Sequence, residues 1–326
     1  MAHDYALEID GLSVDIDTPN GTLHAVRDVS FKVRPGETLC LVGESGCGKS
    51  MTSLAIMGLL PLAAKRSARR LAVRGEDLAH ASRRRANALR GDKMAMIFQE
   101  PMTALNPAYT IGTQLTEHYI HHRKASAAQA RERAAELLHK VGIASAGERL
   151  GQYPHQLSGG LRQRVMIAMA LMCGPEVLIA DEPSTALDVT IQAQILRLLA
   201  ELQAELGIAM VLITHDLGVV ARIAHHVAVM YAGQIVEEAP VHELFATPRH
   251  PYTRGLLDCI PVPGRSQPGT ELGTIPGVVP SLVGTIGGCA FADRCRYATQ
   301  ACRDAIPLHH AQGQHWRCIH AELEAA

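Results

Sequence analysis

The feature that most constrains this chain is a glycine-rich run, Gly-Glu-Ser-Gly-Cys-Gly-Lys-Ser, from Gly43 to Ser50. It matches G-x-x-x-x-G-K-[ST], the pattern of the loop that cradles nucleotide phosphates. The apolar run Thr38 to Val42 precedes it, and an apolar-rich stretch from Ser50 to Leu60 follows it. A strand, a glycine loop and a helix in that order are the context that such a loop requires. The chain is therefore predicted to bind a nucleotide there.

The residue types of this loop fit the binding of phosphates. Its glycines let backbone N–H groups close around the anion, and the helix that follows adds the positive end of its dipole. Lys49 is predicted to reach the β- and γ-phosphates, and Ser50 offers a hydroxyl to Mg²⁺. The residues predicted to bind the nucleotide in this loop are Gly43, Glu44, Ser45, Gly46, Cys47, Gly48, Lys49, Ser50 and Met51.

Length and composition define the broad class of the protein. The chain has 326 residues, 47% of them apolar, which suits one large domain or two medium ones. Its net charge of −1 leaves no basic field, which argues against a nucleic-acid partner. Pro61 and the Gly174-Pro175 pair interrupt the apolar runs before they reach the length of a membrane span, and the N-terminus has no signal-peptide pattern. We expect a soluble, cytoplasmic chain.

Periodicity predicts different elements before and after the loop. Alternating apolar residues within 7–33 predict an antiparallel β-layer. Residues 66–93 are rich in arginine diluted by acidic residues, and we expect a solvated helical face there rather than a phosphate or nucleic-acid patch. Residues 111–175 are predicted to be helical, with an amphipathic pattern over 127–141 that Gly142 ends.

A second anion site is predicted in the Leu-Ser-Gly-Gly run that starts at Leu157. Ser158 is a natural N-cap for a helix that continues through Met172, and Gly160 leaves backbone N–H groups accessible at the positive end of that helix. A capped helix is the ordinary alternative, and the neighbouring motifs favour the functional interpretation.

Three predicted strands deliver polar residues at their carboxyl ends. The strand 94–98 is followed by Gln99, and the strand 177–180 ends in Asp181 and Glu182. A third strand, 210–214, is followed by His215. Between the second and third strands lies the loop Pro-Ser-Thr-Ala-Leu-Asp, which ends at Asp188, and then an apolar-striped helix that stops at Gly207.

In this order and spacing, these motifs resemble the ATPase subunits of ABC transporters. The run Met-Ile-Phe-Gln-Glu-Pro-Met-Thr-Ala-Leu-Asn-Pro around Gln99, the run Tyr-Pro-His-Gln-Leu from Tyr153 and the run His-Pro-Tyr-Thr from His250 narrow the resemblance. Together with a cysteine-rich tail, they resemble the subfamily that imports oligopeptides, dipeptides and nickel. The resemblance covers nearly the whole chain.

The resemblance implies an α/β fold with a P-loop NTPase core. We expect an ABC ATPase nucleotide-binding domain over 1–257, with the N-terminal antiparallel β-layer and a helical subdomain at about 100–175. A C-terminal extension over 258–326 would carry four cysteines.

The resemblance also implies which residues hydrolyse ATP. Glu182 would be the general base that polarises the attacking water, and His215 would contact the γ-phosphate. Asp181 would hold Mg²⁺ with Ser50, while Gln99 would touch the metal or the water and sense the membrane partner. A solvated carboxylate at Glu182 and a structural histidine at His215 are the alternatives. With Lys49, the predicted catalytic residues are Glu182, His215 and Gln99.

Partners follow from the same resemblance. Ser158 and Gly160 would bind the γ-phosphate of ATP held by a second ABC ATPase subunit, which we expect to be non-identical, with Asp188 at the seam. The pair would sit on two transmembrane permease subunits, whose helices dock beside Gln99, and would serve an extracytoplasmic solute-binding protein. The expected location is peripheral, on the cytoplasmic face of the cell membrane.

Two positions depart from the pattern or are open to reaction. Ile16 stands where the family usually places an aromatic residue against adenine, so adenine would pack on an aliphatic surface or on a substitute such as Tyr5. Cys47 occupies a variable position of the loop and would make the site sensitive to thiol reagents if it were exposed.

The tail carries Cys289, Cys295, Cys302 and Cys318, whose spacing is not a paired C-x-x-C zinc pattern. A disulfide framework is not expected in a cytosolic chain. Four thiolates suffice to ligate an iron–sulfur cluster, and similar tails in the subfamily are associated with a [4Fe-4S] cluster. We favour that cluster, with zinc and no metal as alternatives.

Rival functions are weaker. A DNA-repair ABC ATPase would carry a long coiled coil between the phosphate-binding loop and Ser158, where sustained heptads are missing. A translation-associated ABC protein usually carries two nucleotide domains, whereas this chain has one set of motifs. A regulatory subunit would tend to have lost Lys49, Glu182 or His215. Import of peptides or related solutes is favoured over a soluble ABC-class ATPase without permeases, and the sequence does not identify the solute.

Overall fold

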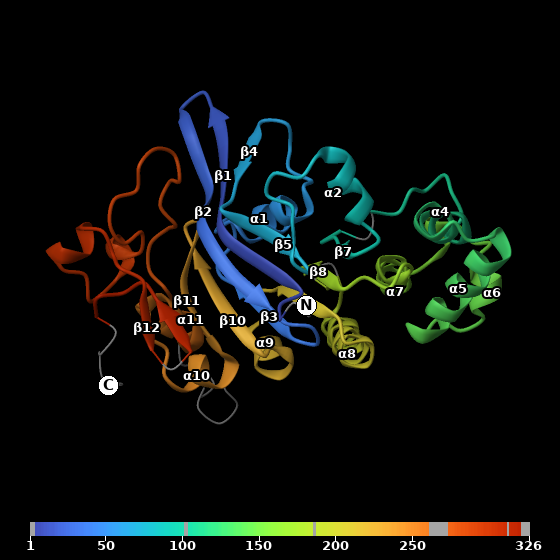
Figure 1. Ribbon diagram of the computed structural model, residues 1–326. Helices are drawn as coiled ribbons and strands as arrows, with labels where there is room; N and C mark the ends of the chain where they lie inside the picture. Colours follow the sequence, from blue (N-terminus) through green and yellow to red (C-terminus); the bar gives the residue numbers. More distant parts are fainter. Residues whose placement is uncertain (1–3, 101–103, 185–186, 261–272, 312, 321–326) are drawn as a thin grey trace. The chain divides into compact units, whose positions relative to one another are not determined.

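The computed structural model describes residues 4–100, 104–184, 187–260, 273–311 and 313–320. Two compact units make up the chain (Figure 1). The first unit contains Met1–Leu7, Val33–Glu37 and Ala72–Ile213, and the second contains Glu8–Lys32, Thr38–Leu71 and Thr214–Ala326.

The first unit is built on three parallel strands, in the order β7, β8, β9. Their registers align Ile97 with Ala180 and Asp181 with Ile213, so their carboxyl ends lie at one edge. All five residues of β8 are buried, and each large apolar side chain among them contributes about 1.5–3 kcal/mol on burial. The strand bounds are β7 Met94–Ile97, β8 Val177–Asp181 and β9 Ala209–Ile213.

Helices make up most of the remainder of the first unit. The helices α4, α5 and α7 pack on one another, and α7 also packs on β7 and α8 (Figure 1, green to yellow). Their bounds are α2 Arg83–Leu89, α4 Ile111–Arg123, α5 Ala127–Lys140, α6 Ala146–Arg149, the 3-10 turn η1 Pro154–Gln156, α7 Gly159–Leu171 and α8 Val189–Leu206. The helices predicted within 111–175 are therefore present, and α5 ends beside Gly142 as expected.

The second unit has a sheet in the order β12, β13, β11, β10, β3. The pair β3–β10 is parallel, whereas β10–β11, β11–β13 and β12–β13 are antiparallel. The tail thus adds two strands to this sheet, which the sequence interpretation missed. The bounds are β3 Thr38–Val42, β10 His226–Tyr231, β11 Gln234–Pro240, β12 His309–Ala311 and β13 Gln314–Trp316.

A β-layer occupies the N-terminal part of the chain, as predicted. The strands β1 (Leu7–Thr18) and β2 (Gly21–Val33) neighbour each other in this sheet, and β4 (Ala64–Ser67) pairs antiparallel with β1. Gly11 lies within β1 at φ +61°, a left-handed conformation that glycine adopts without strain.

The prediction of a solvated helical face over the arginine-rich residues 66–93 is wrong for most of that stretch. Only α2 is helical within it, and strands β5 (Arg70–Val73) and β6 (Glu76–Asp77) precede that helix. Leu71, Ala72 and Val73 are all buried, and β5 pairs antiparallel with β6, so this part of the segment is a buried strand and not a solvated helical face.

The second unit also contains short helices around its sheet. Among the residues that the structure describes, no helix is both long and apolar enough to cross a membrane. The helix bounds are α1 Lys49–Met57, α9 Leu217–Ile223, α10 Val241–Ala246 and α11 Pro251–Asp258, with 3-10 turns η2 Ala292–Arg294 and η3 Gln300–Arg303.

Candidate functional site

The phosphate-binding loop connects the buried strand β3 to helix α1, as the sequence predicts. Gly48 is the N-cap of α1 at φ +106°. Gly43, at φ +151°, packs so closely on β10 that an added Cβ would lie 2.1 Å from the carbonyl oxygen of Met230. An added Cβ at Gly48 would likewise lie 2.5 Å from the carbonyl oxygen of Ala25, so side chains are excluded at both positions and the loop backbone packs closely at the start of the helix.

Lys49 is buried and lies against its own loop. Its Nζ donates to the carbonyl oxygens of Gly43 at 2.8 Å and Glu44 at 2.9 Å. These bonds hold the ammonium against the backbone of its own loop. Ser50, the predicted Mg²⁺ ligand, is the next residue of α1 and is half-buried.

Neighbouring elements of the second unit anchor the loop. The backbone N–H of Glu44 donates to the hydroxyl of Tyr252 at 2.8 Å, and the N–H of Gly233 donates to the carbonyl of Cys47 at 2.9 Å. The Cys47 thiol is fully buried, and burial raises its pKa. The condition for thiol sensitivity at this position, an exposed Cys47, is therefore not met.

The first unit places the predicted base and the predicted glutamine together. Gln99 Nε2 donates to Glu182 Oε2 at 3.2 Å, beyond the carboxyl ends of β7 and β8. Asp181, the last residue of β8, is 4% exposed. In open sheets of this type, ligands bind outside the carboxyl ends of the strands.

Glu182 has a strained backbone. Its φ is +43°, in the left-handed region that non-glycine residues rarely adopt, and its N–H donates to the carbonyl of Ile213 at 3.0 Å. Strain of this kind is stored where the surrounding structure fixes a side chain for a function. The hydrogen bond to β9 and the sharp turn after Asp181 direct the Glu182 carboxylate to Gln99.

Ser158 is the N-cap of α7, as predicted, and accepts a hydrogen bond from the N–H of Leu161 at 3.4 Å. The Ser158 residue is exposed, and Gly160 lies in the first turn, where an added Cβ would approach Ile191 to 3.1 Å. Asp188 is likewise an N-cap, that of α8, and accepts from the N–H of Ile191 at 3.0 Å. Thr185 and Ala186, in the loop before it, lie outside the described residues.

His215 follows β9 and is exposed. Its neighbour Asp216 caps α9 by accepting from the N–H groups of Gly218 and Val219. His215 and the phosphate-binding loop belong to the second unit, whereas Gln99, Asp181, Glu182 and Ser158 belong to the first.

The two positions tied to adenine lie in different units. Ile16 lies in β1 opposite Ala64 of β4 and is half-buried. Tyr5 lies under the guanidinium of Arg34, 5.2 Å from its ring centroid.

The four tail cysteines lie around one small cavity of the second unit. Its lining comprises His250, Pro251, Cys289, Phe291, Ala292, Cys295, Cys302, Ile306, Cys318, Ile319 and His320. The backbone N–H of Thr299 points to the Cys302 sulfur at 3.5 Å and that of His320 to the Cys318 sulfur at 3.3 Å. Burial raises the pKa of Cys318 to about 11 and also raises those of Cys289 and Cys295.

The cysteines around this cavity match a metal site in donor type but not in arrangement. Four thiols converge on it, and backbone N–H groups already face two of the sulfurs. Within the described part of the chain, however, no group of three or more Cys, His, Asp or Glu side chains is arranged to hold a metal ion. Ligation therefore requires the thiols to lose their protons and the side chains to turn inward.

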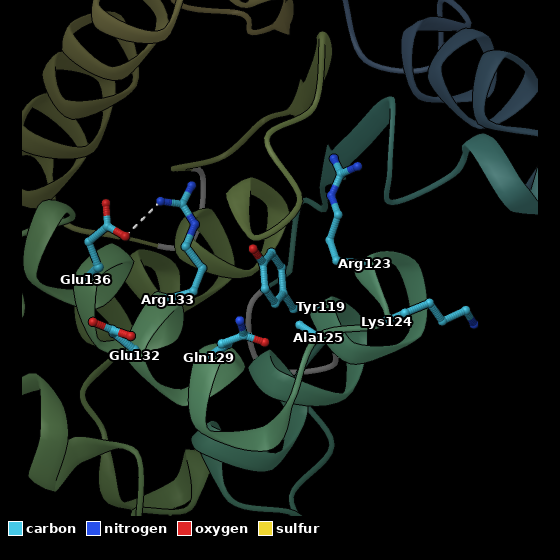
Figure 2. Close-up of a pocket in the computed structure, with 8 residues that line it drawn as sticks. All are labelled: Tyr119, Arg123, Lys124, Ala125, Gln129, Glu132, Arg133 and Glu136. Carbon is cyan, nitrogen blue, oxygen red and sulfur yellow. Dashed lines mark hydrogen bonds and ion pairs between the residues drawn. The ribbon is translucent and has the colours of Figure 1, made fainter.

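A larger pocket, of about 600 Å³, lies between the end of α4 and the first turns of α5 (Figure 2). Its lining carries charges of both signs, and Arg133 and Glu136 pair across 2.9 Å. No residue predicted for nucleotide or metal binding lines it. The lining residues are Tyr119, Arg123, Lys124, Ala125, Gln129, Glu132, Arg133 and Glu136.

Two contacts of the phosphate-binding loop were missed by sequence reasoning. Tyr252 binds the backbone of Glu44, and Arg294 binds its carboxylate. The signal was an acidic side chain inside a loop that receives phosphates, because such a side chain needs a cationic partner.

Comparisons with known proteins agree with this geometry. The family model "ABC transporter" matches residues 26–185, and the model "Oligopeptide/dipeptide transporter, C-terminal region" matches residues 236–302. The dimeric ATP-binding cassette MJ0796, in a post-hydrolysis state with ADP and Pi, superposes with a TM-score of 0.64 at 25% identity, over 72% of this chain and 98% of that chain. The cbiO1 protein of Clostridium perfringens, part of an ABC transporter complex, superposes with a TM-score of 0.63 at 28% identity, over 75% and 92%.

The fold and the site define a P-loop ATPase of the ABC type. Two relatives are more similar to the chain, both called dipeptide transport ATP-binding protein DppD. The Escherichia coli protein is 48% identical over 98% of each chain, and the Bacillus subtilis protein is 51% identical over 92% of this chain and 90% of that one. The chain therefore belongs to the ABC transporter family of ATP-binding subunits, within its oligopeptide and dipeptide transporter group.

Proposed function

We propose that this chain hydrolyses ATP to drive the import of dipeptides, oligopeptides or related small solutes. The observation that carries the proposal is the 48% identity, over 98% of both chains, to a dipeptide transport ATP-binding protein. The match of the C-terminal transporter model to residues 236–302 supports the same group of solutes.

The proposed chemistry divides the work among residues of this chain. Lys49 and the loop N–H groups bind the phosphates, while Ser50 and Asp181 would each supply an oxygen ligand to Mg²⁺, which would neutralise phosphate charge. Glu182 accepts a proton from the attacking water. Gln99 donates a hydrogen bond to the Glu182 carboxylate at 3.2 Å and orients both that carboxylate and the water. His215 donates to the γ-phosphate, which stabilises the charge that develops there.

The proposed assembly contains more than this chain. Ser158 and Gly160 at the start of α7 complete the site of a second ABC ATPase subunit, with Asp188 near the seam, and the exposure of Ser158 supports this role. Two transmembrane permease subunits dock beside Gln99, and an extracytoplasmic binding protein delivers the solute. The chain then lies peripherally on the cytoplasmic face of the membrane.

The domain organisation proposed with this function keeps the ATPase in residues 1–257, including a helical subdomain at about 100–175, and a cysteine-bearing extension in 258–326. The extension holds a [4Fe-4S] cluster through Cys289, Cys295, Cys302 and Cys318, and zinc is the second candidate. The convergence of the four thiols on one cavity supports this. Such a cluster would supply a rigid cross-link of the tail, without entering the ATPase chemistry.

The experiment that tests the import function is an affinity purification of the E182Q protein from detergent-solubilised membranes with ATP and Mg²⁺. Recovery of two multi-span proteins and a second ATPase supports the importer. Recovery of the chain with no membrane protein assigns it instead to soluble ABC-class ATPases, and only ATP hydrolysis stands.

The metal is tested separately by anaerobic purification with iron, sulfide and zinc analysis. Iron and sulfide in the wild-type protein, both lost in C302S, support the cluster. Zinc without sulfide supports the alternative, and a colourless protein without either metal contradicts both.

A further inference from the structure

The phosphate-binding loop is tied to the C-terminal part of the chain by a two-pronged ion pair. Arg294 Nη1 lies 2.6 Å from Glu44 Oε2, and Arg294 Nη2 lies 2.9 Å from Glu44 Oε1. The Arg294 side chain is 5% exposed, and both residues belong to the second unit. Paired contacts of this kind are short, directional and stronger than single ion pairs.

The guanidinium of Arg294 is fixed on its other sides as well. Its Nε donates to the carbonyl of Pro276 at 2.8 Å, its Nη2 to the carbonyl of Ile275 at 3.2 Å, and its Nη1 to the hydroxyl of Tyr231 at 3.3 Å. Arg294 therefore has no freedom to leave Glu44 without breaking several bonds.

A cluster of three aromatic side chains, Tyr231, Tyr252 and Phe291, also holds the Glu44 backbone. The N–H of Glu44 donates to the Tyr252 hydroxyl, and the Tyr252 ring packs on Tyr231, with centroids 4.6 Å apart. Phe291 packs on both tyrosines. The backbone and the carboxylate of Glu44 are thus set by one rigid group of side chains.

Electrostatics gives this arrangement a consequence for binding. A nucleotide triphosphate is strongly anionic, and an unpaired carboxylate in the loop that receives it would repel it. Arg294 neutralises that carboxylate, and the pair is partly shielded from solvent, with the side chains of Arg294 and Glu44 5% and 28% exposed. The loop residue Glu44 is then compatible with phosphate binding because of a partner 250 residues away.

We propose that Arg294 is a positioning residue for nucleotide binding, which neutralises Glu44 and fixes the phosphate-binding loop. Arg294 acts through Glu44 and takes no part in bond breaking. This role makes the affinity of the phosphate-binding loop for ATP depend on the C-terminal part of the chain. Arg294 lies outside all the ATPase motifs.

The position of Arg294 also links the loop to the cysteine cavity. Arg294 ends the turn η2, in which the N–H of Ala292 donates to the carbonyl of Cys289 at 3.1 Å and the N–H of Cys295 to that of Ala292 at 3.2 Å. Cys289 and Cys295 line the cavity. This link rests on the metal site proposed above, whereas the Arg294–Glu44 role does not.

The test is a thermodynamic cycle on the isolated full-length protein, with Mg-ATP and Mg-ADP as probes in titration calorimetry. R294Q is expected to weaken ATP binding about tenfold, as befits one uncompensated nearby charge. In the assembled complex with its second ATPase subunit, the KM for ATP is expected to rise in parallel while kcat stays within about twofold, since the catalytic groups are untouched. R294K recovers part of the affinity. The matched control is R303Q, which removes a 2.7 Å ion pair with Asp293 in the same region and leaves ATP affinity unchanged.

Two readouts separate positioning from a merely structural role. In the E44Q background, R294Q is expected to weaken ATP binding less than twofold, because no carboxylate remains to be neutralised. The R294Q defect also shrinks with added salt, which screens the repulsion, and it is larger for ATP than for ADP. Equal losses in the wild-type and E44Q backgrounds, without salt dependence, overturn the proposal. If R294Q does not fold, R294K and E44Q complete a cycle with the same criterion.

Discussion

At the scale of single residues, the spacing of the sequence motifs assigns a role to each site residue. It does not show which of these side chains lie close together. The motif order identified Gln99 and Glu182, which are far apart in the chain, and the structure joins them at 3.2 Å. The left-handed backbone of Glu182 could not be read from its residue type, because glutamate rarely adopts φ > 0.

The first prediction at this scale concerns Glu182. We expect E182Q to lower ATP turnover by about 10²–10⁴-fold while ATP still binds, since the amide keeps the shape and loses the base. Single-turnover hydrolysis and ATP affinity measured on the same protein check this. E201Q, which removes an exposed pairing partner of Arg197 on α8, serves as the control and should hydrolyse ATP normally. Turnover near the wild-type rate in E182Q would show that another group is the base.

The second prediction at this scale concerns thiol chemistry. The Cys47 thiol is fully buried and its pKa is raised by burial, so iodoacetamide at neutral pH should leave it unmodified. The half-buried Cys259 should react first, although burial raises its pKa too. Peptide mass spectrometry over a time course measures both. Early labelling of Cys47 would contradict the burial of the loop.

At the scale of elements, helix ends and strand ends were read correctly more often than irregular segments. The sequence marks these helix boundaries because the interactions that end a helix are local. Ser158 and Asp188 each accept a hydrogen bond from a backbone N–H three residues further on, and Gly207 ends α8 at positive φ. The strands β5 and β6 were missed because they are only four and two residues long and lie in an arginine-rich segment, and a local pattern cannot show which neighbouring strand covers them.

A pH dependence is predicted for helix α4. Burial holds the pKa of His118 below its ordinary value, and its ring Nε2 lies 3.2 Å from the carbonyl of Gly91. A lowered pKa means that the unfolded chain binds more protons below about pH 6.5, so stability falls as the pH drops from there towards the folded-state pKa. In H118Q, whose side chain cannot titrate, the free energy of unfolding should fall less steeply between pH 7 and 5. Urea unfolding at stepped pH measures this, and identical pH slopes for the two proteins would refute it.

At the scale of the whole molecule, we propose that the motifs form one half of an ATP site shared with a second ATPase subunit. The exposed N-terminus of α7 carries the signature Ser158, which accepts a hydrogen bond within its own helix. A helix end with accessible N–H groups and the positive end of its dipole suits the phosphates of a second subunit's nucleotide.

The prediction at this scale is that S158R separates binding from hydrolysis. The isolated chain should keep its ATP affinity, because its own phosphate-binding loop is intact, whereas the assembled complex should lose about 10²-fold in turnover. S82R removes the N-cap of α2 instead and should leave turnover of the complex unchanged. Loss of ATP affinity in the isolated S158R chain would show that the signature acts within its own chain.

The sequence by itself determined the nucleotide-binding loop, the helix and strand boundaries around it, and the family, because each rests on residue types at fixed local spacing. Only the tertiary structure decided that β13 extends the sheet beside β11, that four thiols share one cavity, and that Arg294 neutralises Glu44. Contacts of that kind join residues far apart in the chain, and no local periodicity records which distant side chain a buried charge will meet.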